Sequence, residues 1–246
     1  MIKSSLISVI SNIITVIISV VSVPFLISNL GNESYAIIGL FLTLQGLLLV
    51  LEGGISISTI ELVVNRRDNF VDFNNFRLLY LTLAVVVLII GFSYADFILI
   101  RWGEKHHLMY SLLISLSLFI RLYLGYFKAQ LFGLFLHSPV FVSSIPLYFF
   151  RFAIPVIFTL SVDNTLLIFC LSYLIELAFY YGYLNKKRTF NSVHSWKFKD
   201  KTNNITGLIT LASILGTILF QSDRIGVSFF YSQSEFGAFQ ALSTFT

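Results

Sequence analysis

Eight ionisable residues lie within the apolar segments of this 246-residue sequence. A charge at mid-membrane depth costs several kcal/mol unless it has a partner or lies in a wet cavity. Such residues are therefore candidates for function. Interior cations bind anionic oxygens, and a guanidinium group can bind two such oxygens at once. Carboxylates in a low dielectric take up protons or bind cations. The basic residues are Arg121, Lys128, Arg151 and Arg224, and the acidic ones are Glu52, Glu61, Glu176 and Asp223.

The spacing of these residues predicts which of them share a helix face. Arg121 and Lys128 are seven residues apart, hence about 20° from each other on one face. Gly125 falls on the same stripe, where it lets a ligand or another backbone approach closely. Asp223 and Arg224 are neighbours, about 100° apart on a helix, so each needs its own partner or a wet cavity.

Glu52 and Glu61 project from opposite sides of one predicted helix. Glu52 follows a wholly uncharged run and stands beside Gly53 and Gly54, so we expect it to face the bundle interior. Glu61 is close to Arg66, and we expect it to reach the cytoplasmic rim. The alternative is that all these charges pair into buried bridges that only orient helices.

The composition excludes an ordinary water-soluble domain. The chain is 57% hydrophobic and 11% charged, with a mean hydropathy of +0.86, whereas soluble domains carry roughly 25% charged residues. The single Cys170 provides no disulfide or thiolate metal site. The basic residues outside the apolar segments gather in loops, which is a topology signal rather than a nucleic-acid-binding face.

The apolar segments predict an all-α, polytopic transmembrane helix bundle. Gly31 separates the first two helices, and Arg151 lies between Pro146 and Pro155, which free backbone groups. We expect a bundle of transmembrane helices at 1–184, a basic cytoplasmic loop at 185–204 that meets anionic lipid headgroups, and a further helix with the start of another at 205–246. The predicted helices are Leu6–Leu30, Tyr35–Val64, Leu78–Tyr94, Met109–Leu136, Pro139–Leu160, Leu166–Leu184, Ile205–Tyr231 and the beginning of another at Glu235–Thr246.

The distribution of Lys and Arg predicts the orientation. With the N-terminus inside, ten basic residues lie in cytoplasmic segments and two, Arg101 and Lys105, in outside loops. Such a bias places the N-terminus in the cytoplasm. Because the last predicted helix stops without a polar tail, we expect the chain to be a truncated protein with a missing C-terminal part.

Signals for other chemistry are weak. His106 and His107 lack acidic or thiol companions at ligand spacing, so we expect no metal there. The sequence contains no GxSxG, P-loop or GxGxxG motif. We therefore expect a protein that is not an enzyme and has no cofactor.

Three stretches together resemble Wzx-type polysaccharide flippases. VPFLISNLGNESYAIIGLFLTLQGLLLVLEGGISIS has the family's Leu-Gly-x-x-x-Tyr turn, its Leu-Gln-Gly step and its acidic residue beside glycine, here Glu52. LFQSDRIGVSFFYSQSEFGAFQALS is similar to the family's seventh helix and the Gly-aromatic start of the eighth. Arg151 resembles an interior cation of that family.

The resemblance implies the fold of the multidrug/oligosaccharidyl-lipid/polysaccharide exporters, a MATE-like fold in which two six-helix lobes surround a cavity. It also implies an O-antigen flippase of the bacterial inner membrane, whose substrate is an oligosaccharide linked to undecaprenyl diphosphate. Partners would be that lipid-linked oligosaccharide, membrane lipids, and the polysaccharide polymerase and chain-length proteins, but no nucleic acid. Candidate diphosphate ligands are Arg121, Lys128, Arg151 and Arg224, and candidate ion-coupling residues are Glu52, Asp223 and Glu176.

Three other functions remain open from the sequence. A drug/cation antiporter of the same superfamily would favour an acidic and aromatic cavity, whereas the apolar segments here carry as many cations as carboxylates. A membrane-bound polysaccharide polymerase would be expected to have a large outside loop, and the longest one predicted is only about Ala95–His107. A non-transporting membrane scaffold would pair its interior charges completely and tolerate their joint replacement.

Overall fold

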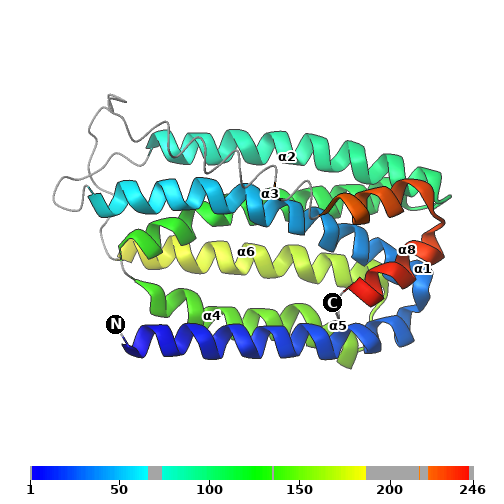
Figure 1. Ribbon diagram of the computed structural model, residues 1–246, viewed down its shortest axis with the longest axis horizontal. Helices are drawn as coiled ribbons and strands as arrows, with labels where there is room; N and C mark the ends of the chain where they lie inside the picture. Colours follow the sequence, from blue (N-terminus) through cyan, green and yellow to red (C-terminus); the bar gives the residue numbers. More distant parts are fainter. Residues whose placement is uncertain (1, 66–73, 135, 187–215, 217–220, 244–246) are drawn as a thin grey trace.

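The computed structural model describes residues 2–65, 74–134, 136–186, 216 and 221–243, and every element in these ranges is helical (Figure 1). The predicted all-α class is therefore confirmed. Residues 221–230 form a further helical stretch. The elements are α1 (Ile2–Asn65), α2 (Asn74–Arg101), α3 (His107–Gly133), α4 (His137–Tyr148), the π-helix η1 (Phe149–Ala153), α5 (Ile154–Ile157), α6 (Val162–Lys186) and α8 (Gln233–Ser243).

Helix α1 consists of two helices joined at Gly31. The backbone of Gly31 has φ 78° and ψ 164°, a conformation that residues with a Cβ rarely adopt. Figure 1 shows the two arms of α1 running in opposite directions on either side of this bend. The predicted break at Gly31 is thus confirmed, and it converts one continuous apolar sequence into two antiparallel helices.

In the described part of the chain, five helical segments are long and apolar enough to cross a membrane. In Figure 1 the long helices lie side by side along the longest axis of the molecule. Large apolar side chains such as Leu78, Ile89 and Ile175 are more than half exposed, as expected for residues that face lipid. The candidate spans are Val9–Leu49, which includes the bend at Gly31 and so parts of both arms of α1, and Arg77–Arg101, His107–Gly133, Pro139–Ile157 and Val162–Lys186.

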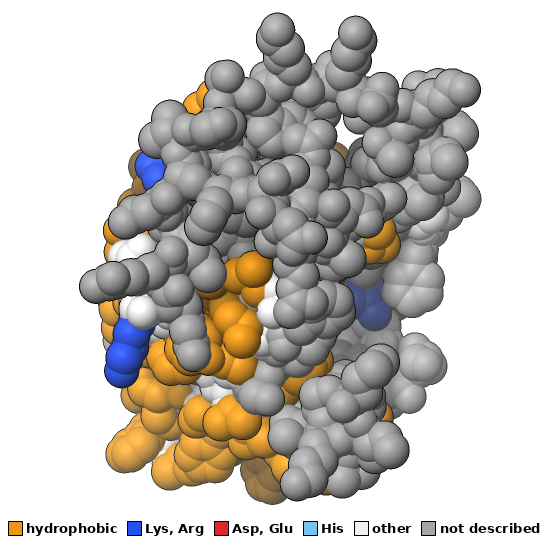
Figure 2. Space-filling model, turned by 90° about the vertical axis from the view of Figure 1, so that its left-hand side faces the viewer, with side chains coloured by type: hydrophobic (Ala, Val, Ile, Leu, Met, Phe, Trp, Pro, Cys, Tyr) orange, Lys and Arg blue, Asp and Glu red, His pale blue; other side chains and the backbone are white. Residues whose placement is uncertain are grey.

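One end of this bundle carries the N-terminus, the start of α2 and the end of α6 (Figure 1). Seen from that end, the described surface is largely hydrophobic, with Lys and Arg side chains at its edges (Figure 2). The predicted basic loop 185–204 falls outside the described residues except for Asn185 and Lys186.

The loop predicted at Ala95–His107 is wrong in its extent. Helix α2 continues to Arg101, because Ala95, Ile98 and Leu99 are fully buried at helical spacing. Asp96 lies within the helix, and its Oδ1 contacts Nδ1 of His107 at 2.6 Å. The connection between α2 and α3 is therefore only the short segment 102–106.

Helix α3 is the centre of the bundle. It packs against α2, α1 and α6, and its Tyr126 is fully buried beside Tyr80 of α2, with ring centroids 5.6 Å apart. Tyr173 and Tyr180 of α6 are buried as well. Large side chains from separate helices thus fill the interior and hold the faces of α3 in place.

Helix α8 packs on the second arm of α1. The amide nitrogen of the buried Gln240 donates hydrogen bonds to the carbonyl oxygen of Gly39 at 2.8 Å and to Oγ1 of Thr43 at 2.7 Å. At the start of α8, the backbone N–H and hydroxyl of Ser232 donate to the carboxylate of Glu235. These hydrogen bonds lower the pKa of the Glu235 carboxyl. Of the predicted helix Ile205–Tyr231, residues 205–215 and 217–220 fall outside the described residues.

Replacing Gly237 of α8 by alanine is expected to destabilise the fold. The added Cβ would overlap the carbonyl oxygen of Asn32 on α1, and backbone cannot yield as a flexible side chain can. We expect a loss of about 1–3 kcal/mol and a lower midpoint of thermal unfolding in detergent. Gly182→Ala is the matched control, because nothing lies within 4 Å of its Cβ. This control should be neutral or slightly stabilising; equal midpoints for the two variants would contradict the packing of α8 on α1.

Candidate functional site: an interior charge cluster

Five ionisable side chains gather inside the bundle as one ion pair and one group of three, and together we call them the interior charge cluster. The second arm of α1, helix α3, η1 and α6 each contribute to it. Its ion pairs have N–O distances of 2.5–2.9 Å. The members are Glu52, Arg121, Lys128, Arg151 and Glu176.

The first pair joins α1 to α3. Nη1 of Arg121 lies 2.9 Å from Oε2 of Glu52, and it donates a hydrogen bond of 3.2 Å to Oε1 of the same carboxylate. Both residues are only 8% exposed. The expectation that Glu52 faces the interior is therefore confirmed.

Gly125 makes room for this pair. A Cβ at position 125 would lie 2.6 Å from Oε1 of Glu52, so any larger residue would displace the carboxylate. The sequence predicted a close approach at Gly125 by a ligand or a backbone. The group that approaches is instead the side chain of Glu52.

Glu176 of α6 is shared by two cations. Its Oε1 lies 2.7 Å from Nζ of Lys128, and its Oε2 lies 2.5 Å from Nη2 of Arg151. The hydroxyl of Tyr180 donates a further hydrogen bond of 3.2 Å to Oε1. Because Glu176 is 2% exposed, these three donors replace the water that the carboxylate has lost.

The π-helix η1 positions Arg151. Pro155 has no N–H, so the carbonyl of Arg151 cannot form the α-helical bond four residues on. The Nε of Arg151 donates to Oγ of Ser172 at 2.6 Å, and its guanidinium carbon lies 3.8 Å from the centroid of the Tyr173 ring. The guanidinium is thus held by a hydroxyl, a carboxylate and an aromatic face.

The charges of the cluster do not cancel. Three basic side chains face two carboxylates among the described residues of the cluster, which amounts to one net positive charge when every group is ionised. Lys128 is the most accessible member, because its side chain is 20% exposed whereas that of Glu176 is 2% exposed.

Two of the predicted site residues lie elsewhere. Asp223 is exposed and accepts a hydrogen bond of 2.7 Å from the backbone N–H of Arg224. Nη2 of Arg224 donates to the carbonyl of Ser243 at 3.3 Å, so this side chain contacts α8. Neither residue forms an ion pair with a described side chain. Glu61 belongs to α1, but its side chain is outside what the structure describes.

Sequence reasoning missed the polar residues that surround Arg151 and Glu176. Ser172, Glu176 and Tyr180 follow one another at intervals of four on an otherwise apolar helix, so they form one stripe. Ser143 of α4 extends this network, with its Oγ 2.9 Å from the Tyr180 hydroxyl. A search for polar residues at helical spacing would have found the stripe, though not its partners.

The fold and the cluster define a class: a multi-pass α-helical membrane protein with buried ion pairs in its interior. Comparison with protein-family models, curated proteins and solved structures gives no match. In the described part of the chain no three His, Cys, Asp or Glu side chains gather as metal ligands. The chemistry of the cluster is therefore the main guide to function.

Glu176→Gln is expected to be the most destabilising single change in the cluster. It leaves Lys128 and Arg151 buried without a counter-charge, and breaking a buried pair costs about 3–5 kcal/mol. Glu52→Gln removes the carboxylate partner of Arg121 alone, so we expect a smaller loss of stability. Thermal unfolding in detergent measures both, with Glu33→Gln as the control, since Glu33 is exposed.

Adding Lys128→Met to Glu176→Gln should restore part of the lost stability, because it removes one of the two unpaired cations. A Glu176→Gln variant that unfolds at the same temperature as Glu33→Gln would show that Glu176 does not hold these cations.

Proposed function

We propose that the protein is a flippase that moves an oligosaccharide linked to undecaprenyl diphosphate from the cytoplasmic to the periplasmic leaflet. The observation that carries this proposal is the interior charge cluster, which holds three cations and a net positive charge. A diphosphate must lose water to cross a membrane, and guanidinium and ammonium groups replace that water best.

The geometry suggests how the anion would be held. Glu176 already orients Lys128 and Arg151, so the two cations reach one carboxylate from different helices. A phosphate group that enters beside Lys128 would take over one or both of these contacts. The ion pairs with Glu176 then serve as the resting state, and they limit the cost of keeping cations buried while no substrate is bound.

The helix arrangement supports the corresponding fold. The two arms of α1, together with α2, α3, α4–η1–α5 and α6, would form the six-helix lobe of a MATE-like exporter. The helical residues 221–230 and α8 would begin the second lobe. We place the protein in a bacterial inner membrane with its N-terminus in the cytoplasm. Rocking of the lobes would then alternate access to the cluster.

Coupling to H⁺ or Na⁺ is part of the proposal. Of the three acidic candidates, Glu52 and Glu176 belong to the cluster, whereas Asp223 is exposed. Protonation of a cluster carboxylate would free its cation for the substrate. Glu52 has one cation and Glu176 has two, so Glu52 is the carboxylate whose neutralisation costs the fold less.

A purely structural role is the second candidate, and one observation favours it: each cation in the cluster has a carboxylate partner. In that case the pairs only orient helices. A drug/cation antiporter is less well supported, because the net positive charge of the cluster would repel a cationic drug. A polysaccharide polymerase is also less well supported, because the connection 102–106 between α2 and α3 is short.

Deleting the gene in its host is expected to abolish surface polysaccharide and to trap lipid-linked repeat units in the cytoplasmic leaflet. Complementation with Arg151→Ala should restore about 10- to 100-fold less transport than the unchanged gene, as expected for one lost charge-assisted contact. Arg101→Ala is the control, because Arg101 is exposed at the end of α2 and forms no ion pair with a described side chain. Normal surface polysaccharide after deletion, in a host without a second flippase, would reject the proposal.

Joint replacement of Glu52 by Leu and Arg121 by Met separates transport from scaffolding. Replacing both partners of a buried pair by apolar residues is often neutral for stability. We expect the double variant to fold, as measured by its thermal midpoint, and to fail in complementation. A variant that folds and transports normally would instead favour the structural role of this pair.

A further inference from the structure

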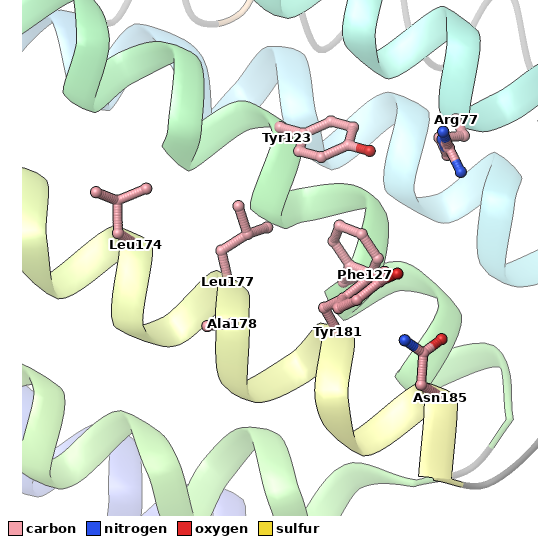
Figure 3. A pocket seen from close by; sticks show the side chains of 8 residues that line it. All are labelled: Arg77, Tyr123, Phe127, Leu174, Leu177, Ala178, Tyr181 and Asn185. Atoms are coloured by element: carbon pink, nitrogen blue, oxygen red, sulfur yellow. The ribbon is translucent and has the colours of Figure 1, made fainter.

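A pocket of about 600 Å³ lies between the start of α2, helix α3 and α6, apart from the interior charge cluster (Figure 3). It is lined by Arg77, Tyr123, Phe127, Leu174, Tyr181 and Asn185, among others. Its volume is in the range of about 300–1,000 Å³ found for small-molecule sites.

The pocket is polar at one end and apolar at the other. Figure 3 shows Arg77, the hydroxyl of Tyr123 and the amide of Asn185 near one end, and Leu174 near the other. Asn185 and Leu174 are both on α6, and eleven residues of helix separate them by about 16 Å. A ligand that fills the pocket therefore needs a polar head and an apolar tail.

The pocket opens to the lipid-facing side of α6. Leu174 is 43% exposed and Tyr181 is 52% exposed, and they share one face because they are seven residues apart. Glu176 projects about 140–160° away from both, into the interior. The pocket and the interior charge cluster thus use different faces of the same helix.

The polar end coincides with the basic end of the bundle. Arg77 stands near the start of α2, and Lys186 follows Asn185 at the end of α6. Within the described ranges Arg77 forms no ion pair. The predicted topology places this end at the cytoplasmic surface, where anionic headgroups gather.

We propose that this pocket binds a lipid phosphate of the cytoplasmic leaflet, with the phosphate on Arg77 and Asn185 and the first part of the chain between Tyr123, Phe127 and Leu174. A guanidinium is the preferred partner of phosphate oxygens. A water-soluble anion would leave the apolar half empty, and a neutral lipid would offer no charge to the Arg77 guanidinium. This site does not depend on the proposed transport function, since it would exist equally in a scaffold.

Two lipids carry the required chemistry, a glycerophospholipid and a polyprenyl phosphate. Native mass spectrometry of the purified chain can separate them, by titration with phosphatidylglycerol against diacylglycerol and with undecaprenyl phosphate against undecaprenol. We expect each phosphate lipid to bind at least about tenfold more tightly than its neutral counterpart. A preference for one phosphate lipid over the other identifies the source.

Two variants tie the binding to the pocket. Arg77→Ala should reduce the affinity for phosphate lipids about tenfold and leave the neutral lipids unchanged. Ala178→Phe should weaken both kinds, because Ala178 lines the pocket and a phenyl ring would fill it. Arg101→Ala, an exposed arginine at the other end of α2, is the matched control and should bind as the unchanged chain does.

The proposal is overturned if neither phosphate lipid binds more tightly than its neutral counterpart. It is equally overturned if folded Arg77→Ala and Ala178→Phe bind all four lipids as Arg101→Ala does. If the chain binds no phosphate lipid preferentially but still flips its substrate, the lipid site is rejected and the proposed function stands. If the chain binds phosphate lipids as expected but does not flip its substrate, the proposed function is rejected and the lipid site stands.

Discussion

The packing of α3, η1 and α6 in the interior depends on the ion pairs and hydrogen bond that the buried Glu176 carboxylate forms. An ionised carboxylate that is 2% exposed is unstable in a low-dielectric interior unless charged or polar donors surround it. Its donors come from α3, from η1 and from α6 itself. Because all of them must reach one group, the rotation of these helices about their axes is closely restricted.

The same interaction creates a conflict between stability and function. Three basic side chains share two carboxylates, an imbalance that would suit the anionic substrate proposed above but that costs stability in its absence. Hydroxyl and aromatic contacts to Arg151 reduce this cost. Under the proposed function, the substrate would have to replace a carboxylate as partner of a cation, and this exchange would couple binding to helix movement.

The two faces of α6 therefore serve different environments. The stripe of Ser172, Glu176 and Tyr180 faces the charged interior, whereas Leu174 and Tyr181 border a pocket that is open to lipid. An α-helix can separate two such environments across its own width because successive side chains are about 100° apart. Helix α6 therefore separates the interior charge cluster from the pocket.

Hydropathy and spacing in the sequence determined the helical class, the break at Gly31, and the shared face of Arg121, Gly125 and Lys128, because these depend on local periodicity. The interior position of Glu52 followed from its uncharged surroundings. Only the tertiary structure decided the pairings: Glu52 with Arg121 across 69 residues, and Glu176 with two cations. It also extended α2 to Arg101 and set Asp223 and Arg224 apart from the cluster. Such partners depend on the rotation and register of helices far apart in the chain, which no local pattern contains.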